Sequence, residues 1–283
     1  MDSAGNLYGT TEGGGDHTAS AGVVFQLVPN GIGGWTYNIL HTFQGGPTGE
    51  VPSDGFQPRS TLFRDEAGNL FGTTYWGGGG GGLCNNPLDG GCGVLFEISP
   101  NLDGSWTYRN LHTFTGANSC GTPGKDGAYP WTQLVSDQAG NLYGTTECGG
   151  KYGYGTVFEF KQVGKKKKWT EVVLHNFSWN PFVSGKHDGI GPTSGVTFDQ
   201  AGNLYGTTEE GGAYGDGGVV FKLTHNANGS WKETVLHSFS GIAGDGAIPF
   251  NFGGVAVDSS GNVYGTTQIG GSYGLGTVFE ISQ

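Results

Sequence analysis

The sequence predicts an all-β protein assembled from one repeated unit, and three observations support this prediction. Glycine contributes 59 of the 283 residues, whereas each interior glycine costs a helix about 1 kcal/mol. No segment shows helical periodicity longer than a turn. The string G-N-[LV]-[YF]-G-T-T recurs at intervals of about 60 residues, which is typical of repeat folds. Its copies start at Gly5, Gly68, Gly140, Gly202 and Gly261.

Each unit contains four expected strands, A to D in chain order. Strand A is an apolar run that ends in aspartate, at 60–63, 132–135, 194–198 and 253–257. After an Asp-x-x-Gly-Asn turn, in which glycine and asparagine favour positive φ, strand B is the recurring string itself. Strand C is a G-x-[VL]-F block, at 23–25, 94–96, 156–158, 219–221 and 277–279. Strand D runs from tryptophan to phenylalanine, at 35–43, 106–114, 169–177 and 231–239.

Four short antiparallel strands per unit of about 60 residues describe a blade of a β-propeller. We therefore expect residues 1–283 to form one five-bladed propeller domain, with repeat copies centred on 5–11, 68–74, 140–146, 202–208 and 261–267. One A and one D strand are missing, so the first and last blades are incomplete. Truncation of a longer array is the favoured explanation; an imperfect ring, or strands exchanged between chains, is the alternative. The second glycine of each string is expected to let a neighbouring blade approach closely.

Charge and composition exclude several classes of protein. The formal net charge is −11. We interpret the only basic run as a solvated hairpin tip; it consists of Lys165, Lys166, Lys167 and Lys168. Nucleic acid is therefore not an expected partner. No stretch approaches the ~20 apolar residues of a membrane span. No N-terminal signal peptide is visible. Because Met1 is the sole methionine, the lack of a visible signal peptide does not establish a cytosolic protein.

Four cysteines, Cys84, Cys92, Cys120 and Cys148, allow three disulfide pairings. The Cys84–Cys92 spacing and the distance to the next cysteine do not match a zinc ribbon or finger. We expect two disulfides, with the pairing left open, and hence an oxidising compartment.

The units D-S-S-G-N-V-Y-G-T-T-Q-I-G-G…G-T-V-F-E-I and W…V-L-H-S-F-S-G…D-G-A-I-P-F resemble the GloVer (Gloeo/Verruco) tandem repeat of bacterial choice-of-anchor proteins. The resemblance covers essentially the whole chain. It implies an exported bacterial protein, secreted or held at the cell surface. It implies no catalytic residue and no cofactor.

One histidine recurs in each D strand, at His41, His112, His175 and His237. Because each copy shares a strand face with two aromatic residues, we interpret these histidines as packing residues that each make one structural hydrogen bond. Copies in different blades are not expected to converge on one ion.

Acidic residues are expected to gather on the face formed by the D–A and B–C loops. Aspartate precedes glycine in the D–A loops, at Asp54, Asp126, Asp188 and Asp245, and glutamate ends three B strands, at Glu12, Glu147 and Glu209. Two interpretations remain open: a ring that binds a ligand or Ca²⁺, or aspartates that cap their own turns. No metal site or cofactor is predicted, because Tyr75 and Gln268 interrupt the ring.

Residues that depart from the repeat are better candidates for a binding site, because the scaffold does not require them. Aromatic rings beside amides and carboxylates suit sugar recognition. The candidate ligand-binding residues are Arg59, Trp76, Asp126, Trp131, Tyr154, Asp188, Asp245 and Asn251, with Trp179 nearby.

We expect a binding or adhesion module that recognises an extracellular glycan or protein through this loop face, as a monomer or a strand-exchanged oligomer. No nucleophile elbow, phosphate loop or pair of acids within the A strands is visible, so catalysis is not expected. A carbohydrate-active hydrolase or lyase acting from a central funnel is the first alternative, and a purely structural surface repeat is the second.

Overall fold

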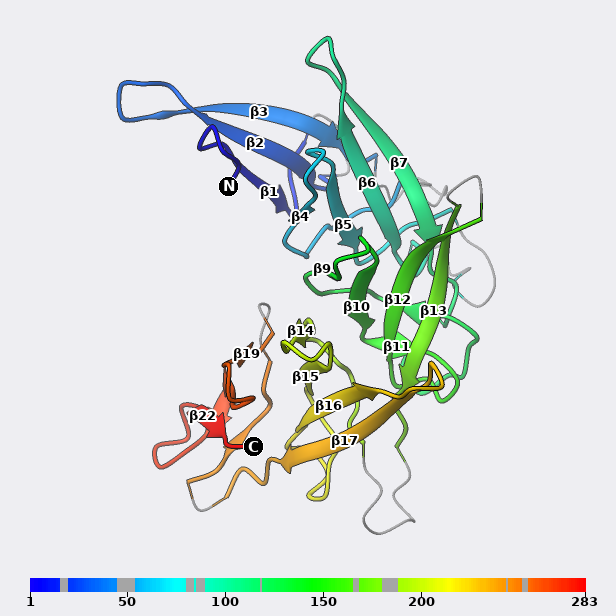
Figure 1. Cartoon of the computed structure of the whole chain (residues 1–283), viewed down its shortest axis with the longest axis vertical. Helices are drawn as coiled ribbons and strands as arrows, with labels where there is room; N and C mark the ends of the chain where they lie inside the picture. The colour runs from blue at the N-terminus through cyan, green and yellow to red at the C-terminus, as the bar shows by residue number, and fades with distance from the viewer. Residues whose placement is uncertain are drawn as a thin grey trace.

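The computed structural model describes residues 1–15, 20–44, 54–79, 84, 90–117, 119–164, 168–179, 188–242, 244–250 and 254–283. These residues form antiparallel β-sheets and loops, without a helix. Five sheets of three or four strands follow one another along an open arc, with the two ends of the chain at its two ends (Figure 1). The described residues contain no helix with the length and apolarity needed to cross a membrane.

Chain order and sheet order coincide, so each sheet is a local meander. The first sheet contains β1 (Leu7–Thr11), β2 (Val23–Pro29) and β3 (Trp35–Thr42). The second contains β4 (Phe63–Arg64), β5 (Leu70–Thr74), β6 (Val94–Pro100) and β7 (Trp106–Thr113). The third contains β9 (Val135–Ser136), β10 (Leu142–Thr146), β12 (Thr156–Val163) and β13 (Lys168–Asn176). The fourth contains β14 (Thr197–Phe198), β15 (Leu204–Thr208), β16 (Val219–His225) and β17 (Trp231–Ser238), and the fifth β19 (Ala256–Val257), β20 (Val263–Thr266) and β22 (Val278–Ile281).

The predicted B, C and D strands are confirmed, whereas the A strands are only two residues long. At the start of strand A, hydrogen bonds from a serine side chain replace the backbone hydrogen bonds between strands A and B. Ser194 Oγ donates to Thr207 O and accepts from Thr207 N, both within 3.0 Å, and Ser60 bridges Thr73 in the same way. Backbone pairing therefore begins only after these serines.

The D–A loops lie against the next sheet, a pairing that the sequence did not predict. β8 (Gly127–Ala128) pairs with β11 (Cys148–Gly149), and β18 (Gly246–Ala247) pairs with β21 (Ile269–Gly270). Single bridges, Phe56 to Trp76 and Ile190 to Glu210, occupy the corresponding places in the other two loops. Each loop is thereby fixed to the B–C connection of the following sheet.

The second glycine of the recurring string faces its own sheet, so the prediction that it admits a neighbouring blade is wrong. A Cβ built on Gly206 would lie 2.7 Å from Cζ of Phe221, its partner across β15 and β16. The other four copies face the equivalent phenylalanine at 2.4–2.6 Å. Glycine is needed here because a Cβ would collide with the ring of the C-strand phenylalanine.

Hydrogen bonds from the first threonine of the string join successive sheets. Thr10, Thr145 and Thr207 donate Oγ1 to the carbonyl oxygens of Ser60, Ser194 and Pro249 of the next sheet at 2.9–3.0 Å. Thr73 reaches Pro130 O at 3.4 Å. The buried phenylalanines of the C and D strands form the apolar cores between the sheets.

Both predicted disulfides form, and the structure decides their pairing. Cys84 is bonded to Cys92, and Cys120 to Cys148. Within the basic run, Lys168 begins β13, and Lys165–Lys167 lie outside the described residues.

Candidate functional site

One position in each D-G-x-x-P loop has a backbone conformation that ordinary side chains rarely adopt. The residue before the proline has a positive φ in all four loops: 55° at Gln57, 60° at Tyr129, 62° at Gly191 and 55° at Ile248. For the β-branched Ile248 this is a genuine outlier, which persists only where the surroundings impose it.

Identical backbone hydrogen bonds impose this conformation. The N–H of Gln57 donates to Ala21 O of the preceding sheet at 2.9 Å, and its carbonyl accepts from Tyr75 N of the following sheet at 3.0 Å. The same two bonds recur at Tyr129, Gly191 and Ile248. The residues on either side of the proline, and those that end the B strands, are therefore held in one rigid frame on the concave side of the arc.

The side chains on this frame differ from sheet to sheet, although the frame does not. The position after the proline holds Arg59, Trp131, Thr193 and Phe250, and the position after the B strand holds Glu12, Tyr75, Glu147, Glu209 and Gln268. Six of these residues contact one another in a chain that we call the central cluster: Glu12, Arg59, Tyr75, Trp131, Glu147 and Phe250.

Arg59 is the centre of this cluster. Its guanidinium carbon lies 4.3 Å from the ring centroid of Tyr75 and 4.4 Å from that of Trp131, which is cation–π distance. Its Nε and Nη2 donate to Glu12 Oε1 at 2.9 and 2.6 Å. The Arg59 side chain is 21% exposed and that of Glu12 is 55% exposed. Solvent therefore reaches the end of the cluster at Glu12.

The opposite end of the cluster is half-buried and acidic. Tyr75 donates its hydroxyl to Glu147 Oε2 at 2.9 Å. Burial raises the pKa of Glu147, although the bond from Tyr75 and the charge of Arg59 oppose the shift. Burial raises the pKa of Glu209 as well, with the charges of Glu147 and Glu210 acting in the same direction. Thr193 is 1% exposed, and its Oγ1 has no hydrogen-bond partner among the described residues.

The structure places the predicted site residues in the central cluster or beside it, in a separate loop contact, or within the D–A loops. Arg59 and Trp131 are central. Trp76 packs beside them, against Tyr75 and Tyr129, with ring centroids 4.8 and 5.0 Å apart. Tyr154 contacts Trp179, with ring centroids 6.2 Å apart, and belongs to a separate loop contact. Asn251 lies outside the described residues.

The three predicted aspartates bind within their own loops. Asp126, Asp188 and Asp245 each accept a hydrogen bond from the Nε2 of the D-strand histidine, at 3.1–3.3 Å. Each also accepts the backbone N–H of the residue three positions after that histidine. These contacts tie each aspartate to the end of the preceding D strand, and they give each histidine the single hydrogen bond expected of it. Asp245 also accepts the backbone N–H of Gly246, as the turn-capping interpretation expects.

Sequence reasoning missed Gln57, Tyr129 and Phe250. At the strained position before the proline, the only sequence signal is that one of the four loops has glycine there, Gly191. The residue types in the other three loops do not predict a positive φ. Phe250 reaches Trp131 from a different loop, with ring centroids 5.7 Å apart, and no local pattern predicts such a contact.

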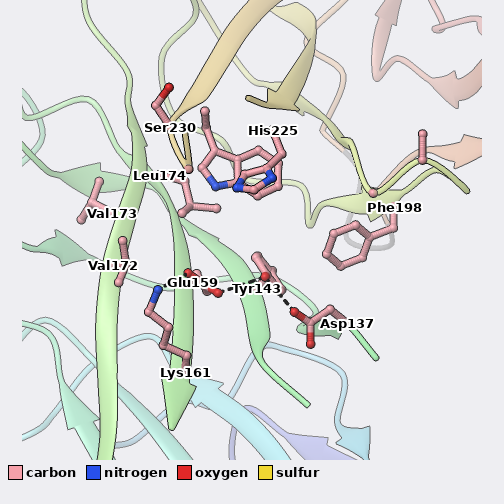
Figure 2. Close-up of a pocket in the computed structure, with 14 residues that line it drawn as sticks. Asp137, Tyr143, Glu159, Lys161, Val172, Val173, Leu174, Phe198, His225 and Ser230 are labelled. Carbon is pink, nitrogen blue, oxygen red and sulfur yellow. Dashed lines mark hydrogen bonds and ion pairs between the residues drawn. The ribbon is translucent and has the colours of Figure 1, made fainter. Parts of the chain in front are cut away.

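A groove of about 740 Å³ lies between the third and fourth sheets. Figure 2 shows Tyr143 between Asp137 and Glu159, with Lys161 beside Glu159. Similar grooves follow between the second and third sheets and between the fourth and fifth. Trp231 and Asp137, which line the first groove, stand at positions that every complete unit fills identically, so we interpret these grooves as products of the repeat.

Comparison with known proteins identifies the repeat. The family model described as the Gloeobacter/Verrucomicrobia repeat matches residues 1–180. The chain belongs to this family. None of the curated proteins matches it.

The chain also matches two solved structures at low similarity. One is described as a putative gluconolactonase; it has a TM-score of 0.43 and 15% identity, covering 98% of this chain and 79% of the other. The second, a protein of unknown function from Dyadobacter fermentans, has a TM-score of 0.46 and 10% identity, covering 96% and 75%. These likenesses assign no activity to the repeat protein.

Proposed function

We propose that this chain is a secreted or surface-exposed binding module, built as a five-bladed β-propeller, that recognises an extracellular glycan or protein through the central cluster. The observation that carries the proposal is the difference in side chains on one fixed backbone frame. A scaffold that needs only packing would repeat one residue at Arg59, Trp131 and Phe250, as it repeats the D-strand histidine.

The chemistry of the cluster supports a sugar ligand in particular. Aromatic rings stack on the apolar faces of sugars, while arginine and carboxylate groups hydrogen-bond the hydroxyls. Trp131 and Tyr75 supply the rings, and Arg59 and Glu12 supply polar groups that solvent reaches. Two disulfides and membership of the repeat family are compatible with an extracellular location.

Binding to glycans and bacterial cell-wall fractions tests the proposal. Trp131→Ala and Arg59→Ala are expected to weaken binding at least tenfold, because each removes a face of the cluster. Trp35→Ala is the matched control, since Trp35 is 49% exposed but begins β3 away from the cluster. Absence of binding by the folded protein to every glycan and cell-wall fraction would rule out the glycan ligand, and equal binding by all three variants would place the site elsewhere.

A hydrolase is the second candidate, favoured by the raised pKa values of Glu147 and Glu209. A carboxyl group whose pKa is raised is suited to act as a general acid beside an ionised partner. If the protein is a glycosidase, a released reducing sugar should appear with polysaccharide substrates, and Glu147→Gln should abolish that release while retaining binding. Binding without release by the native protein would leave the binding module as the function.

A further inference from the structure

A second group of polar residues lies between the second and third sheets, outside the central cluster. His112 comes from β7, Asp126 from the loop before β8, and Glu171 from β13. His112 Nε2 lies 3.1 Å from Asp126 Oδ2 and 3.8 Å from Glu171 Oε2. One potential ligand atom from each residue lies within 4.8 Å of the other two.

Two oxygens of this group are buried without a donor. Asp126 is only 7% exposed, and its Oδ1 has no hydrogen-bond partner among the described residues; Glu171 Oε1 is in the same situation. A buried carboxylate oxygen without a donor is costly, and two such carboxylates close together are more so. Among the described residues, no lysine or arginine forms an ion pair with either carboxylate.

The neighbouring interface shows that the scaffold does not require this arrangement. Tyr108 lies two residues after the tryptophan of β7, as Glu171 lies two residues after the tryptophan of β13. The Tyr108 ring stacks on His41 with centroids 4.2 Å apart, and its hydroxyl donates to Asp54 O at 2.7 Å. A histidine–aspartate pair is therefore completed there by a neutral side chain. Glutamate in this position introduces a charge that the packing alone does not explain.

We propose that His112, Asp126 and Glu171 bind a divalent transition-metal ion of the Zn²⁺ type. One imidazole nitrogen and two carboxylate oxygens are ligands that Zn²⁺ accepts. Ca²⁺ takes six to eight oxygens, which this group does not offer. The ion supplies positive charge between the two buried carboxylates and links the second sheet to the third.

Titration calorimetry with Zn²⁺ on untagged, chelator-treated protein tests this site. The native chain is expected to bind one Zn²⁺, and its Tm is expected to rise with Zn²⁺. Glu171→Gln and Glu171→Tyr are expected to weaken binding at least tenfold and to lose the rise in Tm. The second variant supplies the side chain found at the first interface, so it should fold; circular dichroism checks this. Glu66→Gln, at an exposed turn, is the matched control and should bind as the native chain does.

Three results would overturn the proposal. One is a folded native chain that takes up no Zn²⁺, which would indicate a proton shared between Asp126 and Glu171 instead. Another is unchanged Zn²⁺ affinity in both folded Glu171 variants. The third is Ca²⁺ binding at the same site with equal affinity, which would contradict the assigned class of ion.

Discussion

At the residue scale, one aspartate–asparagine pair closes the A–B turn of every sheet. Asp199 Oδ1 accepts the backbone N–H of Asn203 at 2.9 Å, and its Oδ2 accepts the Asn203 amide at 2.7 Å and the Tyr205 hydroxyl at 3.0 Å. Burial acts to raise the pKa of Asp199, but these bonds leave it below its usual value. The hydrogen bonds of the turn thus keep the carboxylate ionised, and its role is to hold the turn in place.

Glu233 presents the opposite case and allows a pH prediction. Its Oε1 is buried and has no hydrogen-bond partner in the described part of the chain. Burial raises its pKa to about 7; Asp188 adds to the shift and His175 opposes it. Because the folded state holds this proton more tightly than the unfolded chain, Glu233 destabilises the fold as pH rises from about 4.5 to 7.

Glu233→Gln mimics the protonated form at every pH. We expect this variant to exceed the native chain in unfolding free energy by roughly 2 kcal/mol at pH 8 and to match it at pH 4.5. Urea unfolding in the presence of a chelator measures both values, with Glu66→Gln as the exposed control. An equal difference at the two pH values would show that Glu233 does not titrate in this range.

At the scale of the strand, the contact between glycine and phenylalanine sets the spacing of the B and C strands. The C-strand phenylalanine lies over the B-strand glycine in all five sheets. This face of each internal sheet packs against the preceding sheet. Buried rings such as Phe177 and Phe221, with centroids 5.1 Å apart, fill that space.

Gly206→Ala tests this packing. The added Cβ would meet the Phe221 ring at 2.7 Å, and such overpacking costs typically 1–3 kcal/mol. The second substitution Phe221→Leu should recover part of the loss in the double variant, although alone it destabilises the protein. Denaturant unfolding of the three variants measures the coupling. Strictly additive losses would mean that the glycine is needed for another reason.

At the scale of the whole molecule, the arc leaves its two end sheets without a neighbour. Val278 in β22 is 83% exposed, whereas its counterparts Val24, Leu95, Val157 and Val220 are 0% exposed. At the other end, Tyr37 is 52% exposed, while its counterpart Tyr108 stacks on the preceding sheet. These are the two kinds of face that meet at each internal interface.

We expect these faces to associate between copies of the chain, because large exposed apolar patches favour contacts and the two ends are complementary. Sedimentation velocity should show mass rising with protein concentration. Val278→Lys and Tyr37→Lys should each suppress the rise, whereas Ile32→Lys, at a residue 90% exposed in the loop between β2 and β3, should not. A monomer at all concentrations would contradict this prediction.

Much of the fold is predictable because the repeat is local. Strands B, C and D follow from the recurring string, the phenylalanine block and the tryptophan-to-phenylalanine segment. The A strands are shorter than predicted because Ser60 and Ser194 replace part of the ladder with side-chain bonds. The neighbour of the repeated glycine was misjudged, because a period does not say which ring lies over it.

The candidate site was predictable only in part. Arg59 and Trp131 stand out because they break the repeat. Their meeting with Tyr75 and Glu12 depends on positive φ at Gln57, which carries no sequence signal. Glu171 was missed entirely, because its contact with His112 crosses from one sheet to the next.

The sequence by itself determined the repeating unit, the strands within it and the presence of two disulfides. Hydrogen-bonded neighbours in a meander are close along the chain, so alternation and turn residues encode them. The tertiary structure alone decided the cysteine pairing, the central cluster and the group at His112, Asp126 and Glu171. Those contacts depend on how successive sheets stack. The stacking is set jointly by the buried rings and the hydrogen bonds between sheets, and no local sequence pattern specifies it.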